Sequence, residues 1–117
     1  MGRKSRDKGA RGEREFWNTL RDKGINARRT YSAQAAGPGV PDFVTQNQRG
    51  CITWEVKRTK SVKWGEWLKQ LKAQRTENDG CNTLLAFRLD NEEWMYCGFI
   101  DDLQKVTKVL AVYDVEG

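Results

Sequence analysis

The sequence predicts an α/β or α+β fold with a mixed central sheet flanked by helices. Two observations support this prediction. Apolar residues recur at helical spacing in two separate segments, and two pairs of short β-prone runs are each joined by a turn-rich link. The resulting order is helix, three strands, helix, two strands, then a helix or strand, which is typical of a mixed sheet. At 117 residues the chain is long enough for one such domain.

A flexible basic arm is expected at residues 1–9, ahead of a single domain over residues 10–117. The arm is polar, basic and contains glycine, so it has little to bury. Apolar positions at three-to-four spacing then predict an amphipathic helix over about residues 10–23, and Gly24 is a typical stop signal. These apolar positions are Phe16, Trp17 and Leu20.

Three strands are expected after this helix. Residues 25–31 form the first, and the runs 42–46 and 51–58 follow a loop of small residues. A turn-rich link between the last two runs predicts a hairpin. Such a hairpin would bring Asp42 beside Glu55.

The second half of the chain repeats this alternation. A helix is expected over about residues 64–80, followed by strands at 83–89 and 94–99 with an acidic turn between them. The C-terminal part is expected to form a helix over residues 100–108 and a last strand over residues 109–115.

Charge is distributed unevenly along the chain, whose net charge is +5. Residues 1–30 contain ten Lys and Arg against four Asp and Glu, and residues 31–79 contain eight against five. Residues 80–117 reverse the balance, with three against seven. The basic first two thirds indicate a polyanion-binding surface such as one for nucleic acid, although an ordinary solvated surface is the alternative.

Composition excludes several classes of site. The chain has no histidine, which removes histidine-based nucleases, Ser-His hydrolases and histidine-zinc sites. Its three cysteines, Cys51, Cys81 and Cys97, indicate neither a disulfide framework nor a four-ligand zinc site, and are expected as reduced thiols. No apolar run predicts a membrane helix or a signal peptide. A cytoplasmic location is therefore expected, in the host cytoplasm if the chain is phage-encoded.

The central motif combines Pro41-Asp42 with the run Glu55-Val56-Lys57. Side chains on a strand alternate between faces, so Glu55 and Lys57 point the same way, roughly 6–7 Å apart along the backbone. Asp42, Glu55 and the carbonyl of Val56 are oxygen donors of the kind that Mg²⁺ prefers, with Mn²⁺ as an alternative. Lys57 would orient the attacking water or offset charge on a phosphate. No small-molecule cofactor is expected.

The first helix offers a third carboxylate. Glu13 lies three residues before Phe16 and seven before Leu20, so it shares their inward stripe, whereas Glu15 does not. An acid on a core-facing stripe needs a partner, and a metal ion is one. We therefore select Glu13, although favourable placement near a helix N-terminus explains both acids equally well.

These motifs resemble the archaeal-type Holliday junction resolvases, also found in phages, a branch of the PD-(D/E)xK nuclease superfamily. The resemblance covers residues 8–60 and rests on Lys8-Gly9 with Glu13-Arg14-Glu15, on Pro41-Asp42-Phe43-Val44 and on the strand from Ile52 to Lys60. It implies a restriction-endonuclease-like fold, a homodimer, and an active site of Glu13, Asp42, Glu55 and Lys57. It further implies roles for an arginine and a serine, here Arg29 and Ser32, and for a helix glutamine, here Gln70.

A junction-resolving, metal-dependent endodeoxyribonuclease that makes paired symmetric nicks is therefore the leading hypothesis. A four-way junction has two-fold symmetry, which suits a homodimer. The alternatives are a related nuclease acting on another DNA structure and a DNA-binding module without activity, because a Glu-x-Lys strand is often only a surface charge pair. Trp64 and Trp67 are expected in the core or a dimer interface rather than stacked on bases. The residues expected to contact DNA are Arg3, Lys4, Arg6, Lys8, Arg28, Arg29, Ser32, Arg58, Lys60, Lys63 and Gln70.

Overall fold

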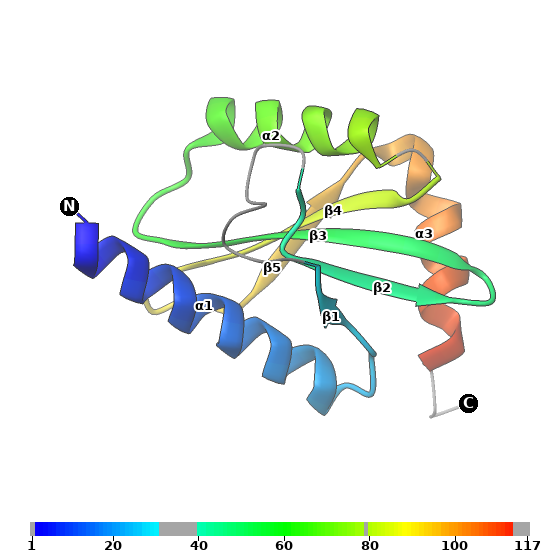
Figure 1. The fold of residues 1–117 in the computed structure, drawn as a ribbon, viewed down its shortest axis with the longest axis horizontal. Helices are drawn as coiled ribbons and strands as arrows, with labels where there is room; N and C mark the ends of the chain where they lie inside the picture. The colour runs from blue at the N-terminus through cyan, green and yellow to red at the C-terminus, as the bar shows by residue number, and fades with distance from the viewer. Residues whose placement is uncertain (1, 31–39, 79, 114–117) are drawn as a thin grey trace.

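The computed structural model describes residues 2–30, 40–78 and 80–113, which form a mixed five-stranded sheet with helices on both faces (Figure 1). The strands lie in the order β1-β2-β3-β4-β5; β3 and β4 are parallel and the other neighbours are antiparallel. The predicted mixed sheet and element order are confirmed. The elements are α1 (Gly2–Asp22), β1 (Arg28–Arg29), β2 (Phe43–Asn47), β3 (Gly50–Thr59), α2 (Trp64–Glu77), β4 (Asn82–Leu89), β5 (Met95–Gly98), the 3-10 turn η2 (Ile100–Asp102), α3 (Leu103–Leu110) and the 3-10 turn η3 (Ala111–Tyr113).

Each face of the sheet has its own core. On one face, α1 and α3 pack over β3, and the apolar side chains there form the larger cluster around Phe16, Trp54 and Val109. On the other face, α2 packs over β4 through Trp67, Leu71 and Leu85. Because β3 is covered on both sides, six successive residues from Cys51 to Val56 are buried. No helix in the described part of the chain is long and apolar enough to span a membrane.

Three sequence predictions are corrected by the backbone. Helix α1 begins at Gly2, so the segment expected as a flexible arm is helical; its lysines and arginines are good helix formers that extend the helix. Strand β1 has only two residues instead of a run over 25–31. The last strand, expected at 109–115, is absent from the described residues up to 113, where α3 and η3 continue. Val106 and Val109 lie three residues apart and are both buried in the core. The apolar residues here therefore recur with the period of a helix and not with that of a strand.

Gly12 sets the close approach of α1 to β3. A Cβ built on Gly12 would lie 2.5 Å from Cβ of Arg58, which is closer than side chains pack. The helix therefore comes near enough to the strand only because this position carries no side chain.

Gly12→Ala is expected to destabilise the fold by about 1–3 kcal/mol, because overpacking displaces α1. Helix propensity alone favours alanine by about 1 kcal/mol. The sign of the change in the free energy of unfolding therefore separates overpacking from helix propensity. Gly9→Ala in the same helix is the matched control. A Cβ at Gly9 meets nothing within 4 Å, so this substitution should stabilise the fold. Urea unfolding of both variants measures this, and equal or greater stability of Gly12→Ala would contradict the packing argument.

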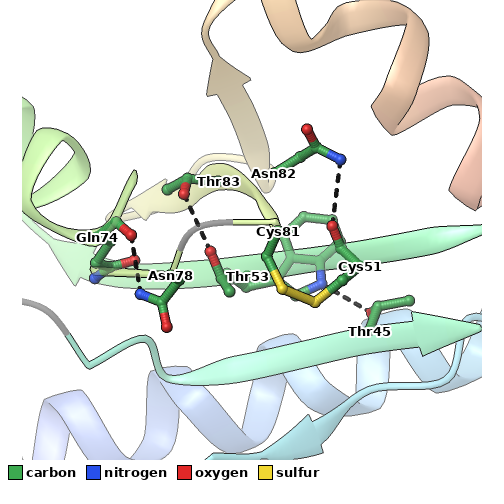
Figure 2. Close-up of a disulfide and its surroundings, with 9 residues drawn as sticks. Thr45, Cys51, Thr53, Gln74, Asn78, Cys81, Asn82 and Thr83 are labelled. Atoms are coloured by element: carbon green, nitrogen blue, oxygen red, sulfur yellow. Dashed lines mark hydrogen bonds between the residues drawn. A yellow bond between two sulfur atoms is a disulfide. The ribbon is translucent and has the colours of Figure 1, made fainter. Parts of the chain in front are cut away.

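The expectation that all three cysteines are reduced thiols is wrong for two of them, because the structure joins Cys51 to Cys81 in a disulfide (Figure 2). The cause is the parallel register of β3 and β4, in which Ile52 lies opposite Asn82, so the residues just before them are neighbours. Their Cα atoms are 4.6 Å apart despite a sequence separation of 30. Asn82 donates from Nδ2 to the carbonyl of Cys51 beside the bridge, at 3.3 Å.

Reducing this disulfide is expected to lower the free energy of unfolding by about 3–4 kcal/mol, because the unfolded chain regains the entropy of a loop of this length. Urea unfolding with and without dithiothreitol measures the effect. Cys97→Ser should keep the full response to the reductant, whereas Cys51→Ala with Cys81→Ala should abolish it. Equal unfolding midpoints for the oxidised and reduced wild type would show that the bridge does not stabilise the fold.

Candidate active site

The hairpin of β2 and β3 places Asp42 against the middle of β3, as the sequence predicted. Phe43 lies opposite Trp54, and the backbone N–H of Asp42 donates to the carbonyl of Trp54 at 2.9 Å. The backbone N–H of Val56 in turn donates to Oδ2 of Asp42 at 2.8 Å. One hydrogen bond therefore fixes the backbone of Asp42 and the other fixes its carboxylate, just before β2 begins.

Glu55 and Lys57 lie on the same face of β3, as their spacing requires. The Nζ atom of Lys57 lies 3.0 Å from Oε2 of Glu55. The Glu55 side chain is only 7% exposed while that of Lys57 is 23% exposed, so the ammonium lies between a buried carboxylate and solvent. The strand thus presents an acid and a cation together, next to Asp42.

The glutamine that reaches this site is Gln74, not Gln70. Nε2 of Gln74 donates to Oε1 of Glu55 at 2.5 Å, and its side chain is fully buried. Gln70, one turn earlier in α2, is only half-buried. Sequence reasoning missed Gln74, although it shares the buried stripe of Trp67 and Leu71, where a polar residue needs a partner.

Burial and neighbouring negative charge raise the pKa of Asp42 from 3.8 to about 7. Desolvation is the largest cause, and the charges of Glu55 and Glu13 act in the same direction. The N–H of Val56 and the ammonium of Lys57 offset only part of this. The three carboxylates of Asp42, Glu55 and Glu13 face two cations, Lys57 and Arg29, which leaves one negative charge in excess when all are ionised.

This excess of negative charge is the observation by which the residues fit a divalent cation. Carboxylate and carbonyl oxygens are the ligands that Mg²⁺ takes, and no histidine or thiolate competes at this point of the sheet. Because N–H and C=O of one strand residue face the same edge, the carbonyl of Val56 faces the side on which Asp42 lies. Asp42, Glu55 and the Val56 carbonyl are thus suited to hold Mg²⁺ or Mn²⁺.

Glu13 lies near this pair but has a cationic partner of its own. Its Oε1 is 2.6 Å from Nη1 of Arg29, whose guanidinium also stacks over the ring of Phe43. Within the described residues, no three acidic or cysteine side chains are close enough to hold a metal by themselves. The neighbouring Glu15 accepts hydrogen bonds from Arg88 and Trp94.

The remaining predicted DNA contacts divide into three groups. Arg28, Lys60 and Lys63 are exposed and available to a ligand. Arg58 is half-buried and pairs with Asp90 at 2.5 Å. The side chains of Arg3, Lys4, Arg6, Lys8 and Ser32 lie outside the part of the chain that the structure describes.

Comparisons with known proteins identify the family. The family model described as archaeal Holliday junction resolvase (Hjc) matches residues 4–116. The chain belongs to the archaeal Holliday junction resolvase family. Its fold resembles the solved structure of Hjc from Archaeoglobus fulgidus, titled a Holliday junction resolvase from an archaeal hyperthermophile. That match has a TM-score of 0.57 and 25% sequence identity, and covers 75% of this chain and 73% of that chain. No curated protein matches the chain in sequence.

Membership of this resolvase family confirms the resemblance that the motifs carried, now over nearly the whole chain. The matched region includes all three elements that build the site: α1, the hairpin of β2 and β3, and α2. The restriction-endonuclease-like fold that the resemblance implied agrees with the mixed sheet and with the Archaeoglobus structure.

The raised pKa predicts how the metal-free resolvase domain responds to pH. A carboxyl whose pKa rises on folding binds its proton more tightly in the folded state, so its contribution to stability is complete below pH 3.8 and is lost as pH rises through about 7. In EDTA, the Tm should therefore fall between these pH values, and Asp42→Asn should flatten the fall. Calorimetry across this pH range measures the Tm of both proteins. The same pH dependence of the Tm in wild type and in Asp42→Asn would contradict the prediction.

Proposed function

We propose that this protein is a metal-dependent endodeoxyribonuclease that resolves four-way DNA junctions by paired symmetric nicks. The observation that carries the proposal is the arrangement of Asp42, Glu55 and Lys57 on adjoining strands, in a chain of the archaeal Holliday junction resolvase family. A Glu-x-Lys strand is often only a surface charge pair. That alternative does not explain why Glu55 is buried or why the pKa of Asp42 is raised.

The acidic side chains of the site bind and orient the cation. Asp42, Glu55 and the carbonyl of Val56 would hold Mg²⁺ or Mn²⁺. Glu13, held by Arg29, would add a third carboxylate to this ligand set. When bound, the cation supplies Lewis-acid polarisation of the scissile phosphate and lowers the pKa of the attacking water.

Lys57 supplies the fixed positive charge of the site. Its ammonium, held 3.0 Å from Glu55, lies at the solvent-facing side of the carboxylates, where a phosphate would enter. There it orients the attacking water and offsets charge that develops on the phosphate oxygens. Gln74 donates to the other oxygen of Glu55, so that the carboxylate remains in place when Lys57 turns toward DNA.

The exposed cations Arg28, Lys60 and Lys63 bind the DNA backbone. Contacts to phosphates position the duplex arms and give little sequence specificity, so the protein recognises the shape of the junction. A homodimer with two active sites matches the two-fold symmetry of the substrate and allows two symmetric nicks.

A panel of substrates tests the proposal. Equal amounts of a four-way junction, a flap and a linear duplex, all of the same arm sequence, are incubated with the purified protein and Mg²⁺. Junction-confined cleavage is expected. Equal cleavage of the duplex or the flap would indicate a nuclease with a broader range of substrates. If none of the three substrates were cleaved, the protein would be a DNA-binding module.

A further inference from the structure

Trp64 is an exposed aromatic side chain on a rigid support. It is the first residue of α2, and half of its surface is exposed. Its ring meets that of Trp67 edge to face, with centroids 6.3 Å apart, and Trp67 is buried against Leu71 and Leu85. An aromatic ring held in this way loses little conformational freedom when it contacts a ligand.

The surroundings of Trp64 are cationic. Lys60, Lys63 and Lys69 are all exposed within five residues of it in the sequence, against one acid, Glu66. The exposed aliphatic Val62 lies beside Trp64 in the sequence, whereas other strongly exposed apolar side chains, among them Tyr96 and Ile100, lie in the acidic part of the chain. Trp64 therefore combines an open ring face with positive charge, which is how proteins bind unpaired bases and their phosphates.

Trp64 also lies close to the catalytic strand. Figure 1 shows that β3, which carries Glu55 and Lys57, leads directly into the start of α2, at the end of the sheet where α1 also begins. Seven residues separate Lys57 from Trp64, so their backbones are at most about 25 Å apart. That span corresponds to about seven base pairs at about 3.4 Å each, which places Trp64 within reach of the branch when a nearby phosphate is cut.

We propose that Trp64 stacks on a nucleobase exposed at the branch point of the junction and so favours branched DNA over duplex. The inference rests on the proposed function. Bases inside a duplex offer only their edges, whereas a branch point exposes a base face on which an indole can stack. The lysines around Trp64 argue against a second copy of the chain as its occupant, because lysine is depleted at protein interfaces and a two-fold axis would bring like charges together.

The experiment measures stacking directly, in EDTA so that the junction stays intact. A junction carries 2-aminopurine at the branch, and a second one carries it in the middle of an arm. Wild-type protein should quench the branch probe and not the arm probe. Trp64→Ala should lose the quenching and bind the junction about tenfold more weakly, with duplex affinity unchanged, while Trp64→Phe should retain most of both.

Tyr96→Ala is the matched control, because it removes an even more exposed aromatic side chain, 71% exposed, from the acidic part of the chain. It should leave affinity and quenching unchanged. Unaltered quenching in Trp64→Ala, an equal loss of junction and duplex affinity, or conversion of a dimer to a monomer in sedimentation would each overturn the inference. Wild-type protein that binds junction and duplex equally would instead contradict the proposed function itself.

Discussion

Asp42→Asn is expected to reduce the single-turnover rate of junction cleavage by roughly a thousandfold while junction affinity stays close to that of the wild type. Asparagine has the size of aspartate, and its amide oxygen can still accept the hydrogen bond that Val56 donates to Asp42. It lacks the negative charge that holds a cation. Because burial raises the pKa of Asp42, the neutral side chain should also fold at least as stably at neutral pH without metal.

Asp101→Asn is the matched control for this substitution. Asp101 is an exposed aspartate in the 3-10 turn η2, remote from β3 in sequence, and its loss should leave cleavage unchanged. Rates from denaturing gels and affinities from fluorescence anisotropy separate chemistry from binding. Cleavage by Asp42→Asn at more than a tenth of the wild-type rate would remove Asp42 from the catalytic site.

Gln74→Ala should slow cleavage by about 10–100-fold, as is usual when a hydrogen-bond partner of a metal ligand is lost. The substitution leaves Oε1 of Glu55 without its buried amide donor, so this carboxylate can turn toward Lys57 alone. Gln74→Glu should be more damaging, because it places a second buried negative charge against Glu55. A positioning role predicts that more Mg²⁺ is needed for half-maximal cleavage.

Gln70→Ala is the control from the same helix, one turn earlier, and should retain nearly the wild-type rate and metal dependence. Titrating Mg²⁺ in single-turnover cleavage separates positioning from a general loss of stability, which calorimetry measures in parallel. If Gln74→Ala lowered the Tm yet cleaved normally with unchanged metal dependence, Gln74 would be a core residue only.

The parts of the site that lie close together in sequence were predictable. The alternation of a strand fixes Glu55 and Lys57 on one face, and a short turn pairs β2 with β3, which is enough to bring Asp42 beside Glu55. Both inferences need only local geometry. The placement of Glu13 near the pair followed from its helical stripe, but its ion pair with Arg29 depends on where β1 packs.

The features that sequence reasoning missed depend on contacts between distant segments. Gln74 contacts Glu55 only because α2 packs back across β4; its place on the stripe of Trp67 and Leu71 predicts burial but not which side chain it meets. The Cys51–Cys81 disulfide likewise depends on the parallel register of β3 and β4, which no turn specifies. At the C-terminus, apolar residues that suggested a strand continue a helical period, since Val106 and Val109 share one buried face.

The most direct test of the proposed site and function is to map the cuts in a four-way junction end-labelled on each of its four strands in turn. With wild-type protein and Mg²⁺, two nicks at symmetric positions on opposing strands are expected, and EDTA should abolish both. Cuts that appear without metal, or that fall at unrelated positions in the arms, would contradict resolution by a metal-dependent site built on Asp42, Glu55 and Lys57.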